Sequence, residues 1–151
     1  MVWPRLAARY DFLQHEIQLH DAYHLDYKIE RVLGGLGFAN WAYEVEQQER
    51  ELGIFFDTII VCTVTGSTHA GMIAGFAGQD RPRRVLGIDA SATLEQTRDQ
   101  VARIARHTAA LIELGRDLRD DEITVLEGWA GDYYGIPVQG TLDAIRLVGS
   151  L

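Results

Sequence analysis

Large apolar and aromatic side chains recur at alternating steps of four and three over the first thirty residues, together with two histidines. This spacing places them on one face of a long helix, and charged and polar residues fill much of the rest. Pro4 fits the start of such a helix, because proline is tolerated at the first helical position. The pattern predicts a helix over residues 4–31, and the GGLG at 34–37 is expected to end it. The stripe consists of Leu6, Tyr10, Leu13, Ile17, His20, His24 and Tyr27.

From residue 38 onward the pattern alternates between helices and apolar runs. A second helix is predicted over 38–52, with Gly53 as its C-terminal cap. Three continuous apolar runs predict buried strands, because a strand covered on both faces need not alternate. Thr93 or Ser91 is a candidate N-cap for the longest of the later helices. The expected strands lie in 57–64, 83–91 and 122–128, and the expected later helices in 68–77, about 93–114 and about 140–148.

Strands joined by helices of this length favour a parallel sheet with right-handed crossovers. The sequence therefore predicts an α/β fold with a three-stranded parallel βαβαβ core. A long helix or a helical hairpin precedes this core. We accordingly divide the chain into a helical leader, residues 1–32, and an α/β part, residues 33–151.

Composition narrows the classes of function. The 151 residues carry a formal net charge of -8 and a sequence pI near 5.0. This balance argues against a nucleic-acid or anionic-membrane partner, since both require an excess of Lys and Arg. No apolar run approaches the roughly 20 residues of a membrane span, and the first residues do not look like a signal peptide. With Cys62 as its single cysteine, the chain is expected to be cytoplasmic.

The stretch that begins at Val64 is the clearest candidate site. It follows the first predicted strand, at the edge of a parallel sheet where ligands bind. The backbone N–H groups of Thr65, Gly66, Ser67 and Thr68 can converge on one oxyanion, and the N-terminus of the next helix adds partial positive charge. Phosphate or sulfate is the expected ligand. The alternative is an ordinary strand-to-helix turn in which Ser67 or Thr68 is the N-cap.

Several long stretches resemble the 1-aminocyclopropane-1-carboxylate deaminase family. The resemblance covers about residues 33–151, and the stretches occur in the family's order. It implies the tryptophan-synthase-β fold of pyridoxal-phosphate enzymes, with the D-cysteine desulfhydrases as close relatives. In that family the V-T-G-S-T loop cradles the cofactor phosphate, a role that falls here on Val64, Thr65, Gly66, Ser67 and Thr68. The stretches are GGLGFANWAYEVEQQERELG, FDTIIVCTVTGSTHAGMIAGF, RRVLGIDASATLEQTRDQVARIARHTA and YGIPVQGTLDAIRL.

The chain departs from the family pattern where catalysis is concerned. The family's cofactor lysine lies in a G-N-K context, whereas the single lysine here, Lys28, lies in HLDYKIERV. The family's G-G-I-Q-S-N and D-P-V-Y-E-G-K segments are also absent. We therefore expect a catalytically incompetent fragment, truncated or engineered, with no catalytic residue and no cofactor in the isolated chain. The alternative is a pyridoxal-phosphate-dependent deaminase, or a D-cysteine desulfhydrase-like lyase, that another chain completes.

The leader raises a further alternative. His20 and His24 lie four residues apart, so they share a helix face and have the spacing of a zinc pair. Packing in a helix–helix seam is the favoured interpretation, and a self-associating helical module that binds metal is the alternative. The apolar face of residues 6–27 and the open edges of a three-stranded sheet both predict a homodimer or higher oligomer.

Four other features are given structural interpretations. Cys62 is expected to be a buried, inert thiol. Asp89 either faces a ligand or caps the next turn, and RPRR at 81–84 is expected to be a solvated turn. Trp129 is expected to pack within its loop, together with Tyr133 and Tyr134.

Overall fold

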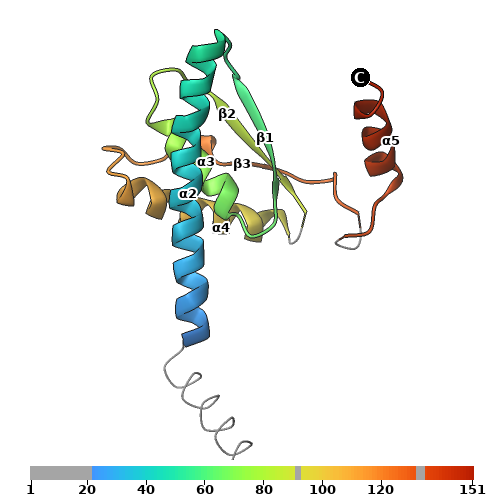
Figure 1. The fold of residues 1–151 in the computed structure, drawn as a ribbon. Helices are drawn as coiled ribbons and strands as arrows, with labels where there is room; N and C mark the ends of the chain where they lie inside the picture. Colours follow the sequence, from blue (N-terminus) through green and yellow to red (C-terminus); the bar gives the residue numbers. More distant parts are fainter. Residues whose placement is uncertain (1–21, 91–92, 132–134) are drawn as a thin grey trace, which may run out of the picture.

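The protein is an α/β unit in which a parallel sheet alternates with helices (Figure 1). The structure is a computed structural model that describes residues 22–90, 93–131 and 135–151, with side chains from residue 33 onward. Among these residues the sheet has three parallel strands in the order β1-β2-β3, which confirms the predicted fold class. The elements are α2 (Ala22–Leu52), β1 (Thr58–Thr63), α3 (Ser67–Ala77), β2 (Arg84–Asp89), α4 (Leu94–Leu111), a 3-10 turn (Asp120–Glu122), β3 (Thr124–Leu126) and α5 (Gln139–Val148).

Local sequence patterns correctly predicted where most of the helices and strands begin and end. Thr93 caps α4 through a capping box with Gln96, as its residue type predicts. Gly53, just after α2, has a positive φ, in the left-handed region that glycine adopts without strain. Two ends differ, because α4 stops at Leu111 and β3 is only three residues long.

The predicted break between two N-terminal helices is wrong. α2 runs without interruption from Ala22 to Leu52 and so passes through GGLG. Residues 1–21, which include most of the predicted 4–31 helix, lie outside the described residues. A glycine costs a helix only about 1 kcal/mol relative to alanine, so a favourable packing contact can outweigh it.

The packing of α2 on α3 and α4 explains why glycines are needed there. A Cβ on Gly71 would collide with the backbone oxygen of Gly35, and one on Gly75 would lie 2.6 Å from the backbone oxygen of Ala39. A Cβ on Gly35 would in turn strike the side chain of Thr108 in α4. The glycines of α2 and α3 therefore let the helix backbones approach closely. The GGLG motif is part of a helix-packing surface.

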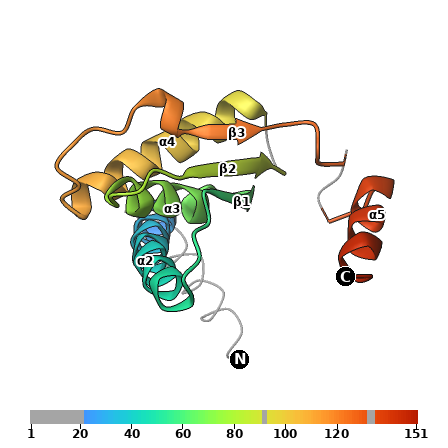
Figure 2. The same cartoon turned by 90° about the horizontal axis from the view of Figure 1, so that it is seen from above.

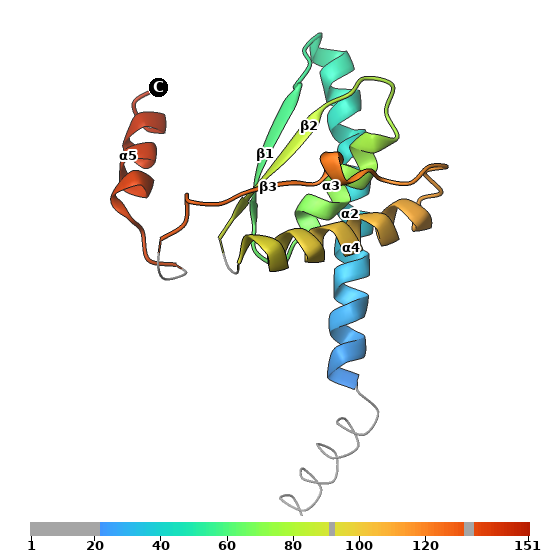
Figure 3. The same ribbon diagram turned by 180° about the vertical axis from the view of Figure 1, so that it is seen from behind.

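The sheet has one covered face and one open face. Val85, Thr63 and Val125 point to the side covered by α3 and α4, and all three are buried. Ile60, on the opposite face of β1, is 69% exposed, and Cys62 on the same face is also exposed. The expectations of strands buried on both faces and of a buried Cys62 are therefore wrong. In Figures 1 and 3, α2, α3 and α4 lie together on one side of the sheet.

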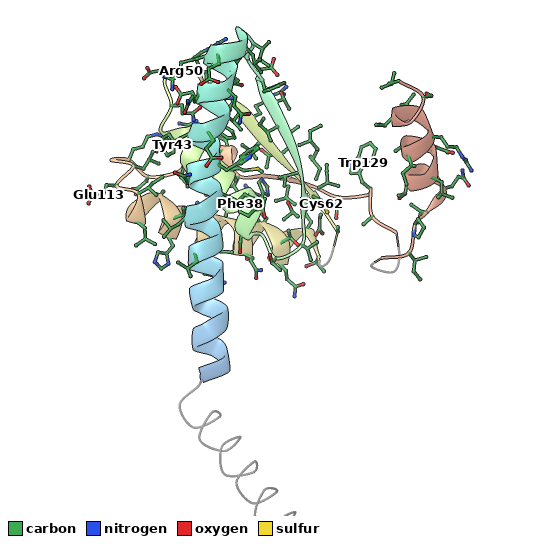
Figure 4. All side chains as sticks on the ribbon, viewed as in Figure 1. Phe38, Tyr43, Arg50, Cys62, Glu113 and Trp129 are labelled. Carbon is green, nitrogen blue, oxygen red and sulfur yellow. The ribbon has the colours of Figure 1, made fainter. Side chains whose placement is uncertain are left out.

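The segment after β3 leaves this body. In Figure 2, seen from above, α5 stands apart from the sheet and the other helices, as it also does in Figures 1 and 3. Every residue of α5 is exposed. Trp129 is 70% exposed, so its predicted packing is wrong, and Tyr133 and Tyr134 lie outside the described residues. Figure 4 shows the Trp129 side chain in the region between the sheet and α5.

A buried ion pair joins α2 to the turn between α3 and β2. The guanidinium of Arg83 donates to both carboxylate oxygens of Glu49, at 2.7 and 2.8 Å, and both side chains are almost fully buried. The same guanidinium lies over the rings of Phe55 and Phe76. Arg83 holds the pKa of the Glu49 carboxyl below its usual value. RPRR is therefore not simply a solvated turn, because its third residue fixes the end of α2 to the core.

Candidate phosphate-binding site

The VTGST loop joins the carboxyl end of β1 to the N-terminus of α3, as the sequence predicts. Gly66 is the N-cap of α3 and has φ 82° and ψ -10°, in the left-handed region. A side chain at this position would be strained, and its Cβ would lie 3.1 Å from Cγ2 of Val101 in α4. Glycine is therefore favoured by the turn, and a Cβ here would also press on α4.

No side chain caps α3 at its N-terminus. The alternative in which Ser67 or Thr68 is the N-cap is wrong, since these are the first two residues of the helix. The first intrahelical bond runs from the Ala70 N–H to the Gly66 oxygen, at 2.9 Å. The N–H groups of Ser67, Thr68 and His69 therefore have no acceptor within the helix.

A left-handed residue followed by a right-handed one makes a backbone concavity that suits an anion. Gly66 followed by the first turn of α3 has this sequence of conformations. Thr65 is exposed, and Val64, Ser67 and Thr68 are partly exposed, so a ligand can approach the loop from solvent. The partial positive charge of a helix N-terminus favours the same kind of ligand.

The loop is held from the α4 side. The Gln100 amide donates to the backbone oxygen of Thr65 at 2.6 Å. Asp89, at the end of β2, is buried and accepts a hydrogen bond from the Thr97 hydroxyl at 2.9 Å. The Asp89 carboxylate therefore contacts α4. This hydrogen bond is neither a contact with a ligand nor a cap of the next turn, the two roles that the sequence suggested. Gln100 and Thr97 were missed from the sequence, because only the fold brings α4 against this loop.

His69 lies directly behind the loop and was also missed. It is fully buried, its Nδ1 is 3.1 Å from the Thr63 hydroxyl, and its ring lies against Gly87, where a Cβ would collide with it. Burial lowers the pKa of His69 to about 4, and the Val85 backbone acts weakly in the opposite direction. Nε2 is buried without a hydrogen-bond partner of ordinary geometry. His69 is therefore neutral at pH 7 and packs the base of the loop.

The other sequence candidates lie away from this loop or cannot be placed. His20 lies outside the described residues, and His24 lies in α2, where its side chain is not described. Among the described residues, no group of three or more His, Cys, Asp or Glu side chains could hold a metal ion. In that same part of the chain, no helix has the length and apolar character needed to cross a membrane.

Comparison with known proteins agrees with the resemblance seen in the sequence. The chain is 57% identical over 122 residues to a 1-aminocyclopropane-1-carboxylate deaminase of Burkholderia vietnamiensis, covering 81% of this chain and 36% of the relative. It is 58% identical over 118 residues to the enzyme of that name from Ralstonia nicotianae, and 59% identical over 118 residues to that of a Methylobacterium species. These two matches each cover 78% of this chain and 35% of the relative. No protein-family model matches the chain.

The extent of these matches limits what they establish. At 57–59% identity over about four fifths of the chain, common ancestry is secure. The chain spans about a third of the length of the curated relatives it matches. Over most of its length this chain is therefore a homologue of the 1-aminocyclopropane-1-carboxylate deaminases and corresponds to a fragment of such a protein.

Proposed function

We propose that the chain contains the phosphate-binding part of a pyridoxal-phosphate enzyme of the 1-aminocyclopropane-1-carboxylate deaminase type. In this proposal the backbone of Val64–Thr68 binds the cofactor phosphate. The observation that supports it most directly is the left-handed Gly66 immediately before an uncapped helix N-terminus. High identity to deaminases supports the same assignment.

The residues present fit a phosphate group. Its oxygens can accept hydrogen bonds from the N–H groups at the start of α3, which have no acceptor within the helix. The hydroxyls of Thr65, Ser67 and Thr68 are further donors, and these three residues are at least partly exposed. When bound, pyridoxal phosphate supplies the electron sink for amino-acid chemistry. The contribution of the loop is to hold the cofactor's phosphate in place.

We further propose that this chain alone does not deaminate 1-aminocyclopropane-1-carboxylate. Pyridoxal-phosphate enzymes need a lysine to carry the cofactor and move protons. The single lysine, Lys28, lies in α2, six residues before Gly34 and so about 9 Å along the helix from it. A Cβ on Gly34 would lie 3.2 Å from the Ser67 Cβ, so this part of α2 passes the start of α3. Lys28 is therefore the residue to test first.

Phosphate titration followed by amide NMR tests the binding proposal. Shifts are expected to cluster at Thr65 to His69 and to weaken at higher salt, because the ligand is charged and partly exposed. Gly66→Ala should abolish them. Gly53→Ala is the matched control, since Gly53 also has positive φ, lies at the far end of α2, and has nothing within 4 Å of the position that a Cβ would take. If millimolar phosphate shifts no amide in the loop, the proposal fails.

An activity assay tests the second proposal independently. With pyridoxal phosphate and 1-aminocyclopropane-1-carboxylate, the isolated chain should form no α-ketobutyrate above a buffer blank. Turnover that disappears in Lys28→Ala would overturn the proposal and assign the cofactor lysine to Lys28. Turnover that appears only when a second protein is added would support the alternative of an enzyme completed by another chain.

A further inference from the structure

The open face of the sheet is apolar towards the carboxyl ends of its strands, whereas at the start of β2 Arg84 lies on the same face and donates a hydrogen bond to the Thr58 hydroxyl at 2.9 Å. In register across the strands, Ile60 pairs with Leu86, and Cys62 pairs with Ile88, which pairs in turn with Leu126. Ile60 is 69% exposed, Cys62 and Leu126 are exposed, and Leu86 and Ile88 are partly exposed. We call these five residues the open-face patch. It lacks charged side chains even though the chain carries a formal net charge of -8.

α5 also carries an exposed apolar surface. Leu142, Ile145 and Val148 recur at helical spacing on one side, and all three are exposed. A polar stripe runs beside these residues and consists of Gln139, Asp143 and Arg146, linked by hydrogen bonds to the Asp143 carboxylate at 2.7 and 3.0 Å. The helix is therefore amphipathic, but its apolar side has no cover among the described residues.

The same chain therefore carries an uncovered apolar sheet face and an uncovered apolar helix face, and each of these surfaces can cover the other. α5 stands apart from its own sheet in all three ribbon views, at the end of the segment that leaves β3 (Figures 1–3). A chain with a projecting apolar arm and an uncovered apolar acceptor is self-complementary, and two copies can satisfy both needs around a two-fold axis. Removal of both surfaces from water provides the driving force.

We propose that the chain forms a symmetric dimer in which α5 of each copy covers the open-face patch of the other. The occupant of the patch is a second copy of this chain, and its contact residues are Leu142, Ile145 and Val148. The polar stripe of α5 faces solvent in the dimer. The proposed contact residues do not include those of the VTGST loop, and the proposal does not invoke phosphate binding.

Cys62 is a built-in probe of this dimer. It belongs to the open-face patch, lies near the carboxyl end of β1 (Figure 4), and is the only cysteine of the chain. Its reaction with a maleimide should be slow at high protein concentration and should become fast on dilution. Protection that does not change with concentration would show that α5 covers its own sheet, and the absence of protection would show an open patch. Either result overturns the proposal.

Cross-linking identifies the partner directly. Ile145→Cys, oxidised with diamide, should form a disulfide with Cys62 of another copy and give a covalent dimer on a non-reducing gel. Arg146→Cys is the matched control, because it places the thiol on the polar stripe one residue away, and it should cross-link much less. A disulfide within one chain, or equal dimer formation by both variants, contradicts the proposal.

Sedimentation equilibrium supplies a readout that needs no added thiol. Ile145→Asp should raise the dimer dissociation constant at least about 100-fold, because it places a charge in an apolar contact. Gln139→Asp, which adds the same carboxylate to the polar stripe, should leave it within about threefold. A compact monomer for the unmodified chain at high concentration would overturn the proposal.

Discussion

The two faces of the sheet show how differently the same strands are used. On the covered face, helices pack so closely that glycines are required, a histidine is fully buried and an ion pair is removed from water. On the open face, apolar side chains of the same strands remain exposed, and α5 stands away from them. The difference comes from the helices that pack on one face only and not from the strand sequences, because β1 carries apolar side chains on both sides.

This comparison predicts a steep contrast in tolerance to mutation. Substitutions on the covered side should change the free energy of unfolding, because every side chain there has close neighbours. Substitutions on the open side should change self-association and leave the stability of the single chain almost unaffected. The following predictions test this contrast, from the largest expected effect to the smallest.

Breaking the buried ion pair should have the largest effect. Glu49→Gln removes the negative charge opposite Arg83. It should lower the free energy of unfolding by about 3–5 kcal/mol, because a buried guanidinium is left uncompensated. Glu46→Gln on the same helix is the control, since Glu46 pairs with the exposed Arg50 at 3.5 Å. Loss of that exposed pair should cost roughly 0.5 kcal/mol or less. Urea unfolding measures both, and equal losses would contradict the prediction.

Acid should destabilise the covered side through His69. Its pKa is about 4 in the fold against 6.5 in the unfolded chain, so the unfolded state binds the proton more tightly. The stabilising contribution is complete above pH 6.5 and is lost as the pH falls towards 4. The loss amounts to roughly 3 kcal/mol. Urea unfolding between pH 7 and pH 4 measures the slope.

Two variants separate His69 from the carboxylates that also titrate in this range. His69→Gln should flatten the dependence of stability on pH relative to the unmodified chain. His107→Gln, at an exposed position of α4, is the control for replacing a histidine outside the core. A slope that His69→Gln does not alter would show that the buried histidine is not its source.

Where a helix glycine touches a neighbouring helix, the usual preference for alanine over glycine within a helix should be reversed. Gly75→Ala should destabilise the fold by about 2 kcal/mol, since overpacking against the backbone of α2 outweighs the gain in helix propensity. Gly37 is exposed in α2, and a Cβ there meets nothing within 4 Å. Gly37→Ala should therefore stabilise the fold by up to about 1 kcal/mol. Thermal unfolding of the two variants should shift in opposite directions. Shifts of the same sign would show that propensity dominates at both sites.

The smallest effect is expected on the open face. The Ile60 side chain is already exposed, and threonine suits a strand. Ile60→Thr, measured where the chain is monomeric, should change the free energy of unfolding by roughly 0.5 kcal/mol or less. Ile73→Ala, in the buried part of α3, should cost about 2–5 kcal/mol in the same assay. A large loss for Ile60→Thr would mean that the open face is covered within the single chain.

Much of the candidate site followed from the local sequence. Gly66 between a strand and a helix predicted the turn, and its left-handed conformation confirms why glycine stands there. Gln100, Thr97 and His69 did not follow, because their roles come from α4 and β2 packing against the loop. Short-range patterns indicate turns and caps but do not show which distant helix lies beside them.

The sequence by itself determined the α/β class, the parallel sheet, the cap at Thr93 and the position of the VTGST loop, because each depends on patterns that are local in the chain. Only the tertiary structure decided that α2 continues through GGLG, that Arg83 is buried, and that Cys62 is exposed. A glycine that ends a helix and a glycine that admits a neighbouring helix have the same local signature. An apolar strand likewise carries no information on whether a second layer covers it, since burial is a property of what packs against the strand.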